Sequence, residues 1–381
     1  MRTSSTNRYD GIQVLRLVAA LLVVVTHATL YTTERLNPGL GVWRFGAIGV
    51  DIFFVISGFV MMASTRSLVG MPNGWKYFAM RRITRIVPIY WIATTVKLLT
   101  LLAIPAAVLH ATLSSKVLMS YFFLPTRNVD GNVEPLLGVG WTLLFEMAFY
   151  TIFAISLLVR ANTLTFCGIV LSALAVGNIF RGNSWPPALV YLDAQVLYFL
   201  AGMMIAAYVI RGHRARYLVG LAYVAGLASF IHIVNAVRHG TFSVWLDLLR
   251  HPAVVALVLA VVVAEPLLSG HLPRVLTFGG DASYSLYLFH PLCAPIVPTA
   301  LAVLGLTNAT VSVVLCVVAV AVVASFIYRF VERPITRQLH KRLPYVRTPK
   351  PRMEILTSSV RAEADGLDDP HGQVTKPGAG R

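Results

Sequence analysis

The stretch GIQVLRLVAALLVVVTHATLY (residues 11–31) decides the fold class. Apart from Arg16, His27 and a few uncharged polar side chains it is apolar throughout. A helix needs about 20 mostly apolar residues to cross the hydrocarbon layer of a membrane. The run is too long, and the residues before it too weakly basic, for a cleaved signal peptide. We therefore expect it to be retained as a membrane-spanning helix.

The composition of the whole chain agrees with this segment. Of its 381 residues, 57% are hydrophobic and only 13% are charged, whereas soluble domains carry about 25% charged residues. These values exclude a soluble enzyme, a disordered protein, a collagen-like chain and a disulfide-rich secreted protein. They predict an all-α, polytopic integral membrane protein. Ten runs can span, and they lie at 12–33, 46–66, 85–109, 141–159, 163–180, 189–210, 217–237, 251–268, 276–303 and 308–331.

The predicted organisation has three parts and no separate soluble domain. Residues 1–11 form an N-terminus, residues 12–333 a ten-helix membrane domain, and residues 334–381 a basic tail. From about Pro344 the tail is rich in Pro, Gly and charge, which predicts disorder. The segment KVLMSYFFL (116–124) is too short to span and is expected to be interfacial or re-entrant.

The positive charges are sorted between the two sides of the predicted membrane domain. The net charge is +16, and 23 Lys and Arg residues fall on the side of the termini against seven on the opposite side. The positive-inside rule therefore predicts that both termini are cytoplasmic. Since this charge reports topology, we expect the lipid bilayer and no nucleic acid as a partner.

Ionisable side chains inside the spans are the best pointers to function, because they are costly there. At about 1.5 Å per residue, five of them from five helices fall in one layer in the outer part of the membrane: His27, Asp51, Glu146, Asp193 and His290. An imidazole whose tautomer is fixed by a carboxylate can act as a general base. The alternatives are a proton relay and a buried polar network that holds helices together.

A second set of candidates consists of arginines. Arg16 and His27 are eleven residues apart, about three helical turns, and so share one face of the first helix. Arg82 and Arg85 are three residues apart at the start of the predicted third helix and also share a face. Arginine binds phosphate bidentately, so the pair suits a phosphorylated cofactor that arrives from the cytoplasm. Plain anchoring of the helix by positive charge explains the pair equally well.

Small residues in GAIGVDIFFVISGF (46–59) predict close helix contacts, through Gly46, Gly49, Ser57 and Gly58. Pro291 directly follows His290, where it either widens the site or simply kinks the helix. The three cysteines all fall inside spans at spacings that do not suit a metal. We therefore expect neither a disulfide nor a metal site.

Taken together, these motifs resemble the membrane-bound acyltransferase 3 family, and within it the exopolysaccharide O-acetyltransferases of the ExoZ type. No single motif is specific for this family, but the order and spacing of the motifs together are. The matching pieces are the spacing of Arg16 and His27, GVDIFFVISGF (49–59), RRITRIVPIYW (81–91), GWTLLFEMAFY (140–150), YFLAGM (198–203) and SYSLYLFHPL (283–292).

The resemblance implies a ten-helix enzyme of the bacterial inner membrane. Such enzymes move an acyl group, commonly acetyl, from cytoplasmic acyl-coenzyme A to a hydroxyl of a sugar, lipid-linked or free, and some work beside polysaccharide-assembly proteins. It implies that His27 is the essential histidine and Arg16 its motif partner. Arg82 and Arg85 would be the pair linked to coenzyme A, and Glu146 the acid of its motif. Many relatives carry a further hydrolase-like domain, which we do not expect here.

Three other functions are compatible with the sequence. The acceptor could be a small molecule such as a macrolide sugar. The buried acids and histidines could instead carry protons in a transporter or exporter. The chain could also be a structural subunit of a polysaccharide-export complex, although it offers no large soluble docking domain.

Overall fold

A computed structural model describes residues 9–104, 116–128, 130–182 and 185–343. Within these ranges the chain is helical, with one isolated antiparallel bridge between Arg127 and Val133 and no strand. Ten helical segments are long and apolar enough to cross a membrane. The predicted all-α, ten-span fold is thereby confirmed.

The helices are divided more finely than the spans. The α-helices are α1 (Asp10–Arg35), α2 (Ile48–Ser64), α3 (Gly74–Ala103), α4 (Lys116–Tyr121), α5 (Trp141–Leu158), α6 (Thr163–Gly177), α7 (Val196–Ile210), α8 (Ala215–His239), α9 (Arg250–Val263), α10 (Glu265–Leu268), α11 (Arg274–Asp281), α12 (Ser283–Cys293), α13 (Ile296–Val303), α14 (Ala309–Ile327) and α15 (Arg333–Arg342). The 3₁₀ turns are η1 (Arg44–Ala47), η2 (Arg66–Leu68), η4 (Gly138–Gly140), η5 (Asn178–Phe180) and η6 (Pro187–Tyr191). The π-helical turns are η7 (Val244–Leu249) and η8 (Tyr328–Glu332).

Two of the predicted spans differ from the observed helices. Helix α3 begins at Gly74 instead of residue 85, because Phe78 is buried in the core and the long arginine stems that follow can lie along apolar surface. Arg82 and Arg85 therefore lie well inside α3, not at its start. The predicted ninth span is broken into α11, α12 and α13. The predicted border at 333 falls inside a continuous helical stretch formed by α14, η8 and α15, and residues 344–381 of the predicted disordered tail lie outside the described residues.

Helices α2 and α7 make the most extensive contact of the fold. A Cβ atom on Gly58 would lie 1.9 Å from the carbonyl oxygen of Phe199, and a Cβ on Gly202 would lie 1.9 Å from that of Val55. No side chain fits at either position, so the two backbones touch. The predicted close contact at Gly58 is confirmed, and Gly202 supplies its counterpart on α7.

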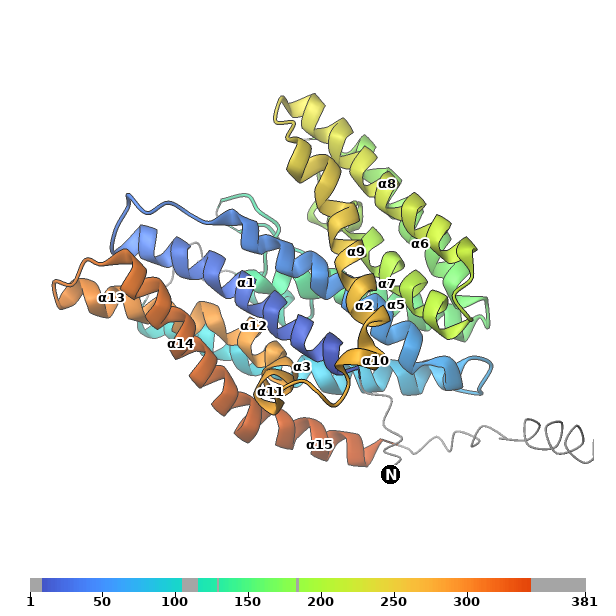
Figure 1. Ribbon diagram of the computed structural model, residues 1–381. Coiled ribbons are helices and arrows are strands. Elements are labelled where there is room, and N and C mark those ends of the chain that lie inside the picture. Colours follow the sequence, from blue (N-terminus) through green and yellow to red (C-terminus); the bar gives the residue numbers. More distant parts are fainter. Residues whose placement is uncertain (1–8, 105–115, 129, 183–184, 344–381) are drawn as a thin grey trace, which may run out of the picture. The chain divides into compact units, whose positions relative to one another are not determined.

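Helix α1 organises the rest of the bundle. It packs against α2, α9, α11, α12, α13 and α14 (Figure 1). Its first turn is capped by Glu265 of α10, whose carboxylate accepts hydrogen bonds from the backbone N–H groups of Asp10 at 2.6 Å and Gly11 at 3.0 Å. We call the face of the bundle where α1 begins the proximal face, and the face where it ends the distal face.

Candidate active site

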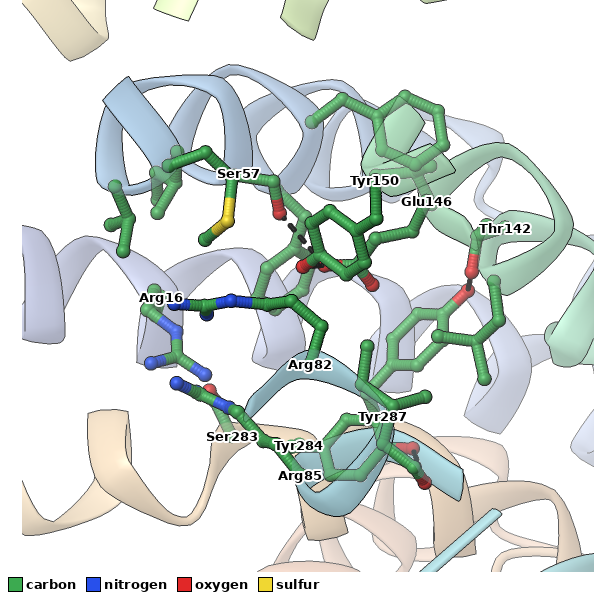
Figure 2. A pocket seen from close by; sticks show the side chains of 18 residues that line it. Arg16, Ser57, Arg82, Arg85, Thr142, Glu146, Tyr150, Ser283, Tyr284 and Tyr287 are labelled. Carbon is green, nitrogen blue, oxygen red and sulfur yellow. Dashed lines mark hydrogen bonds between the residues drawn. The ribbon is translucent and has the colours of Figure 1, made fainter. Parts of the chain in front are cut away.

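A cavity of about 100 Å³ lies among α1, α2, α3, α5 and α12 (Figure 2). We call it the arginine cavity. Its apolar wall comes mainly from α2. Its polar lining consists of Arg16, Ser57, Arg82, Arg85, Thr142, Glu146, Tyr150, Ser283, Tyr284 and Tyr287.

Three guanidinium groups dominate this cavity and gather on one side of it in Figure 2. The guanidinium carbon of Arg82 lies 5.9 Å from the ring centroid of Tyr150, and its Nε is buried without a hydrogen-bond partner. Arg16 has one long hydrogen bond of 3.4 Å to Gln13. Within the described ranges, none of Arg16, Arg82 and Arg85 forms an ion pair. Unpaired, converging guanidinium groups are suited to phosphate or carboxylate.

One carboxylate, that of Glu146, lines the same cavity. It accepts a hydrogen bond of 3.0 Å from the hydroxyl of Ser57 and a short one from the hydroxyl of Tyr150. These bonds hold it on the α2 and α5 side of the cavity. Cations outnumber carboxylates three to one in the lining, so an anionic ligand would balance the charge.

One face of helix α12 bears a row of polar side chains, the ladder, which begins at this cavity and continues beyond it. Tyr284, Tyr287 and His290 are three residues apart and so share one side of the helix, each step rising about 4.5 Å. The hydroxyl of Tyr287 lies 2.9 Å from that of Thr142 and donates to the carbonyl oxygen of Val139 at 3.2 Å. The ring centroids of Tyr287 and His290 are 5.9 Å apart.

His27 stands at the end of this ladder. Its ring centroid lies 4.7 Å from that of His290, with the rings edge to face. Its Nδ1 lies 2.9 Å from the carbonyl oxygen of Val23, one turn earlier in α1. Because a carbonyl can only accept, Nδ1 carries the proton and Nε2 keeps its lone pair. The backbone therefore sets the tautomer that a general base needs.

His27 lines a second cavity, of about 380 Å³, which opens toward the distal ends of α1, α3 and α12. We call it the histidine cavity. Its polar lining consists of His27, Tyr31, Glu34, Arg35, Lys97, Asn128, Asp130, Asn132, Glu134 and Trp141. Such a mixture of charges, amides and aromatic rings is suited to a polar, hydroxyl-rich ligand.

A single layer of side chains separates the two cavities. Tyr287 and Thr142 line the arginine cavity, whereas Val139, which accepts the hydroxyl of Tyr287, lines the histidine cavity. His290 touches Tyr287 on one side and His27 on the other. His290 thus links the side chains at the edge of the arginine cavity to His27.

The structure brings together some of the candidate residues and separates others. His27 joins His290, and Arg16 joins Arg82 and Arg85, as described. Asp51 is 1% exposed and accepts a hydrogen bond of 2.6 Å from Nε of Arg250, which ties α2 to α9. Asp193 lies beside Arg181 near the start of α7, with 3.5 Å between the charged atoms.

Neither Asp51 nor Glu146 is the partner of His27 in the described part of the chain. The sequence placed these side chains at a similar depth, but depth does not fix the direction in which each helix points them. Asp51 faces α9 and Glu146 faces α2. The hydrogen bond that orients His27 comes from its own helix instead.

Sequence reasoning missed the tyrosines of the site. Tyr150, Tyr284 and Tyr287 line the arginine cavity. The spacing of Tyr284, Tyr287 and His290 in SYSLYLFH was a usable signal, because side chains three residues apart share a helix face. Tyrosines are common in apolar helices, however, and this pattern alone does not separate a site from a core. Over the described residues, no group of three or more His, Cys, Asp or Glu side chains is placed to hold a metal ion.

Comparison with known proteins gives a consistent picture. A family model described as an acyltransferase domain, Acyl_transf_3, matches residues 9–330. The exopolysaccharide production protein ExoZ of Rhizobium meliloti (strain 1021) is 35% identical over 306 residues, which cover 78% of this chain and 91% of that protein. No solved structure matches the chain.

Two further relatives are more distant. The peptidoglycan O-acetyltransferase OatA of Listeria monocytogenes serovar 1/2a (strain ATCC BAA-679 / EGD-e) is 23% identical over 372 residues, covering 87% of this chain and 57% of that protein. Nodulation protein 10 of Rhizobium leguminosarum bv. viciae is 26% identical over 315 residues, covering 76% of this chain and 83% of that protein.

Proposed function

The chain belongs to the acyltransferase 3 family, and from this premise we propose that it moves an acetyl group from acetyl-coenzyme A to a sugar hydroxyl of a cell-surface polysaccharide or exopolysaccharide. The observation that carries the proposal is a pair of cavities, one cationic and one polar and lined by His27, with Tyr287, Thr142 and Val139 between them. The names of two relatives refer to exopolysaccharide production and to peptidoglycan O-acetylation, which supports a carbohydrate acceptor.

The arginine cavity is the donor side. Arg16, Arg82 and Arg85 supply the positive charge that attracts the phosphates of coenzyme A. The cavity itself is small, about 100 Å³, so we place the nucleotide outside it at the proximal face, with only the end of the pantetheine arm entering. Glu146 accepts hydrogen bonds from Ser57 and Tyr150 and so holds these two side chains in the wall of the cavity.

The reaction takes place in the layer between the cavities. The sugar hydroxyl in the histidine cavity attacks the thioester carbon, a C–O bond forms and the C–S bond breaks. Nε2 of His27 takes the hydroxyl proton and returns it to the leaving thiolate. His290 holds the imidazole of His27 through its edge contact. Transfer through an acyl-histidine uses the same atoms and is distinguished by trapping labelled acyl group on the protein.

The orientation follows from the charge distribution. The proximal face carries most of the Lys and Arg residues, so we place it in the cytoplasm, where acetyl-coenzyme A is made, with the chain in the bacterial inner membrane. The acceptor then enters the histidine cavity from the opposite side. Asp51 ties α2 to α9 through Arg250, and we assign it a structural role instead of the catalytic one that the sequence suggested.

The test uses purified protein in lipid nanodiscs with acetyl-coenzyme A and glycans from a strain that lacks this gene. His27→Ala should lower acetyl transfer at least about 100-fold, the usual contribution of a general base, and leave coenzyme A binding unchanged. The matched control is His232→Ala, which removes a histidine of α8 that packs on His251 outside both cavities. Normal transfer by His27→Ala would overturn the mechanism.

The strongest rival is a proton-coupled transporter, which would use the same buried histidines. Coenzyme A binding separates the two functions. A transporter has no need of it, whereas the acyltransferase should bind coenzyme A and lose that affinity when Arg82 or Arg85 is replaced by Gln.

A further inference from the structure

We propose that a third cavity, on the distal face beside the histidine cavity, is a second sugar subsite, so that the acceptor is an oligosaccharide and not a single sugar. We call it the tryptophan cavity. It has a volume of about 530 Å³ and lies among α5, α8, η5, η6 and the segments before α5 and α7. The inference rests on the proposed function, because it assigns the part of the acceptor that extends beyond the reacting hydroxyl.

The tryptophan cavity and the histidine cavity are neighbours that share part of their walls. Both are lined by Asn132 and by Trp141, the first residue of α5. The ring of Trp141 packs edge to face on Phe145, 5.8 Å away, which lines the tryptophan cavity only. We therefore place the reacting sugar at His27 and the next sugars beyond Trp141, in the tryptophan cavity.

The lining of the tryptophan cavity has the chemistry of a carbohydrate site. Trp141 and Trp185 offer flat apolar faces against which the C–H face of a pyranose ring can pack. Asn178, Asn235 and Gln195 offer amide donors and acceptors for ring hydroxyls. Arg127, Arg181 and Asp193 add charged groups to this lining, which disfavours a lipid tail as the occupant.

The polar groups are held in place before any ligand arrives. Asn235 donates a short hydrogen bond to the side chain of Asn178, which itself donates to the carbonyl of Leu192 at 2.8 Å. Arg181 pairs with Asp193 at 3.5 Å. Prearranged groups of this kind reduce the ordering that binding requires.

One group in this wall lacks a partner. Oε1 of Gln195 is buried and accepts no hydrogen bond from the described residues. Burial of an unsatisfied amide oxygen is costly, and a turn of the Gln195 side chain toward the cavity would let this oxygen accept a hydrogen bond from a sugar hydroxyl. Gln195 lies outside the arginine cavity and the histidine cavity, so the transfer step does not use it.

The test measures acylation and binding as a function of acceptor length. Glycans from a strain that lacks this gene are partly hydrolysed and separated into fractions from monosaccharide to hexasaccharide. Wild-type protein should show a kcat/KM that rises at least about tenfold between the monosaccharide and the longer fractions, as one or two added hydrogen bonds would give. Calorimetric binding without donor should show the same trend.

Two variants remove the subsite without touching the transfer layer. Trp185→Ala deletes an aromatic face but keeps the carbonyl to which Arg127 donates. Gln195→Ala removes the unpartnered amide. It provides a second test of the subsite if Trp185→Ala folds poorly. Each should abolish the preference for long acceptors and leave the monosaccharide rate and coenzyme A binding unchanged. The matched control Trp245→Ala removes an exposed tryptophan that lines none of the three cavities.

The outcomes separate the two proposals. Transfer by wild-type protein with no dependence on length, or a length preference that both variants retain, overturns the subsite. Length-dependent binding that both variants lose, without acetyl transfer to any fraction, refutes the proposed function and supports an oligosaccharide site. Absence of both binding and transfer refutes both.

Discussion

Replacing Arg85 by Gln should weaken donor binding and, at the same time, stabilise the donor-free protein. Arg85 lines the arginine cavity with Arg16 and Arg82, and Glu146 is the one carboxylate in that lining. In the described ranges Arg85 has no ion pair to lose. In the free protein these three guanidinium groups therefore repel one another, and a bound phosphate would reduce the repulsion. The groups needed to bind the donor thus lower the stability of the donor-free protein.

The expected magnitudes follow from this geometry. A hydrogen bond to a charged group contributes about 1.5–3 kcal/mol, so Arg85→Gln should raise the Kd for acetyl-coenzyme A about 10- to 150-fold. Repulsion between neighbouring like charges amounts to about 1–4 kcal/mol at an effective dielectric constant of about 20. The donor-free variant should therefore have a Tm equal to or above that of the wild type, and saturating donor should raise the Tm of the wild type more.

The assay is differential scanning fluorimetry in detergent with and without donor, beside calorimetric titration of acetyl-coenzyme A. The matched control is Arg81→Gln, which removes an exposed arginine of the same helix that does not line the cavity. It should change neither quantity appreciably. A fall in the Tm of donor-free Arg85→Gln, or an unchanged Kd, would refute the charge argument.

Three further variants test the packing and the buried polar groups. Gly202→Ala places a Cβ 1.9 Å from the carbonyl of Val55 and should destabilise the bundle by about 1–3 kcal/mol or more, seen as a lower Tm; a wild-type Tm would contradict the backbone contact. Asp51→Asn leaves Arg250 without its charge partner and should cost about 3 kcal/mol, with the Kd for coenzyme A unchanged; a selective loss of transfer at a wild-type Tm would instead make Asp51 catalytic. Burial raises the pKa of the Glu265 carboxyl, an effect that Asp10 adds to and the hydrogen bonds from the backbone of α1 oppose. The folded state therefore holds this proton more tightly than the unfolded state, and stability should fall as pH rises from below 4.5 through the raised pKa. Glu265→Gln should lack that component in a plot of Tm against pH, and parallel curves for the two proteins would contradict it.

The fold followed from the sequence because its causes are local. Hydrophobic run length set the ten spans, and small residues such as Gly58 marked where helices approach closely. The start of a helix differed from the prediction where charged and apolar residues lie next to each other in the sequence. The apolar run predicted a third span from residue 85, with Arg82 and Arg85 at its start, but the helix begins at Gly74 because the buried Phe78 holds that turn in the core.

The sequence by itself determined which polar side chains are exceptional and roughly how deep they lie, since hydropathy and a fixed rise per residue suffice for that. It placed His27, His290, Glu146 and Asp51 in one layer. Only the tertiary structure decided which of them meet. His27 packs on His290, while Glu146 turns to Ser57 and Asp51 to Arg250. The physical reason is that a side chain's partner depends on the rotation of its helix about its own axis and on the neighbour it crosses, which the packing of the whole bundle fixes.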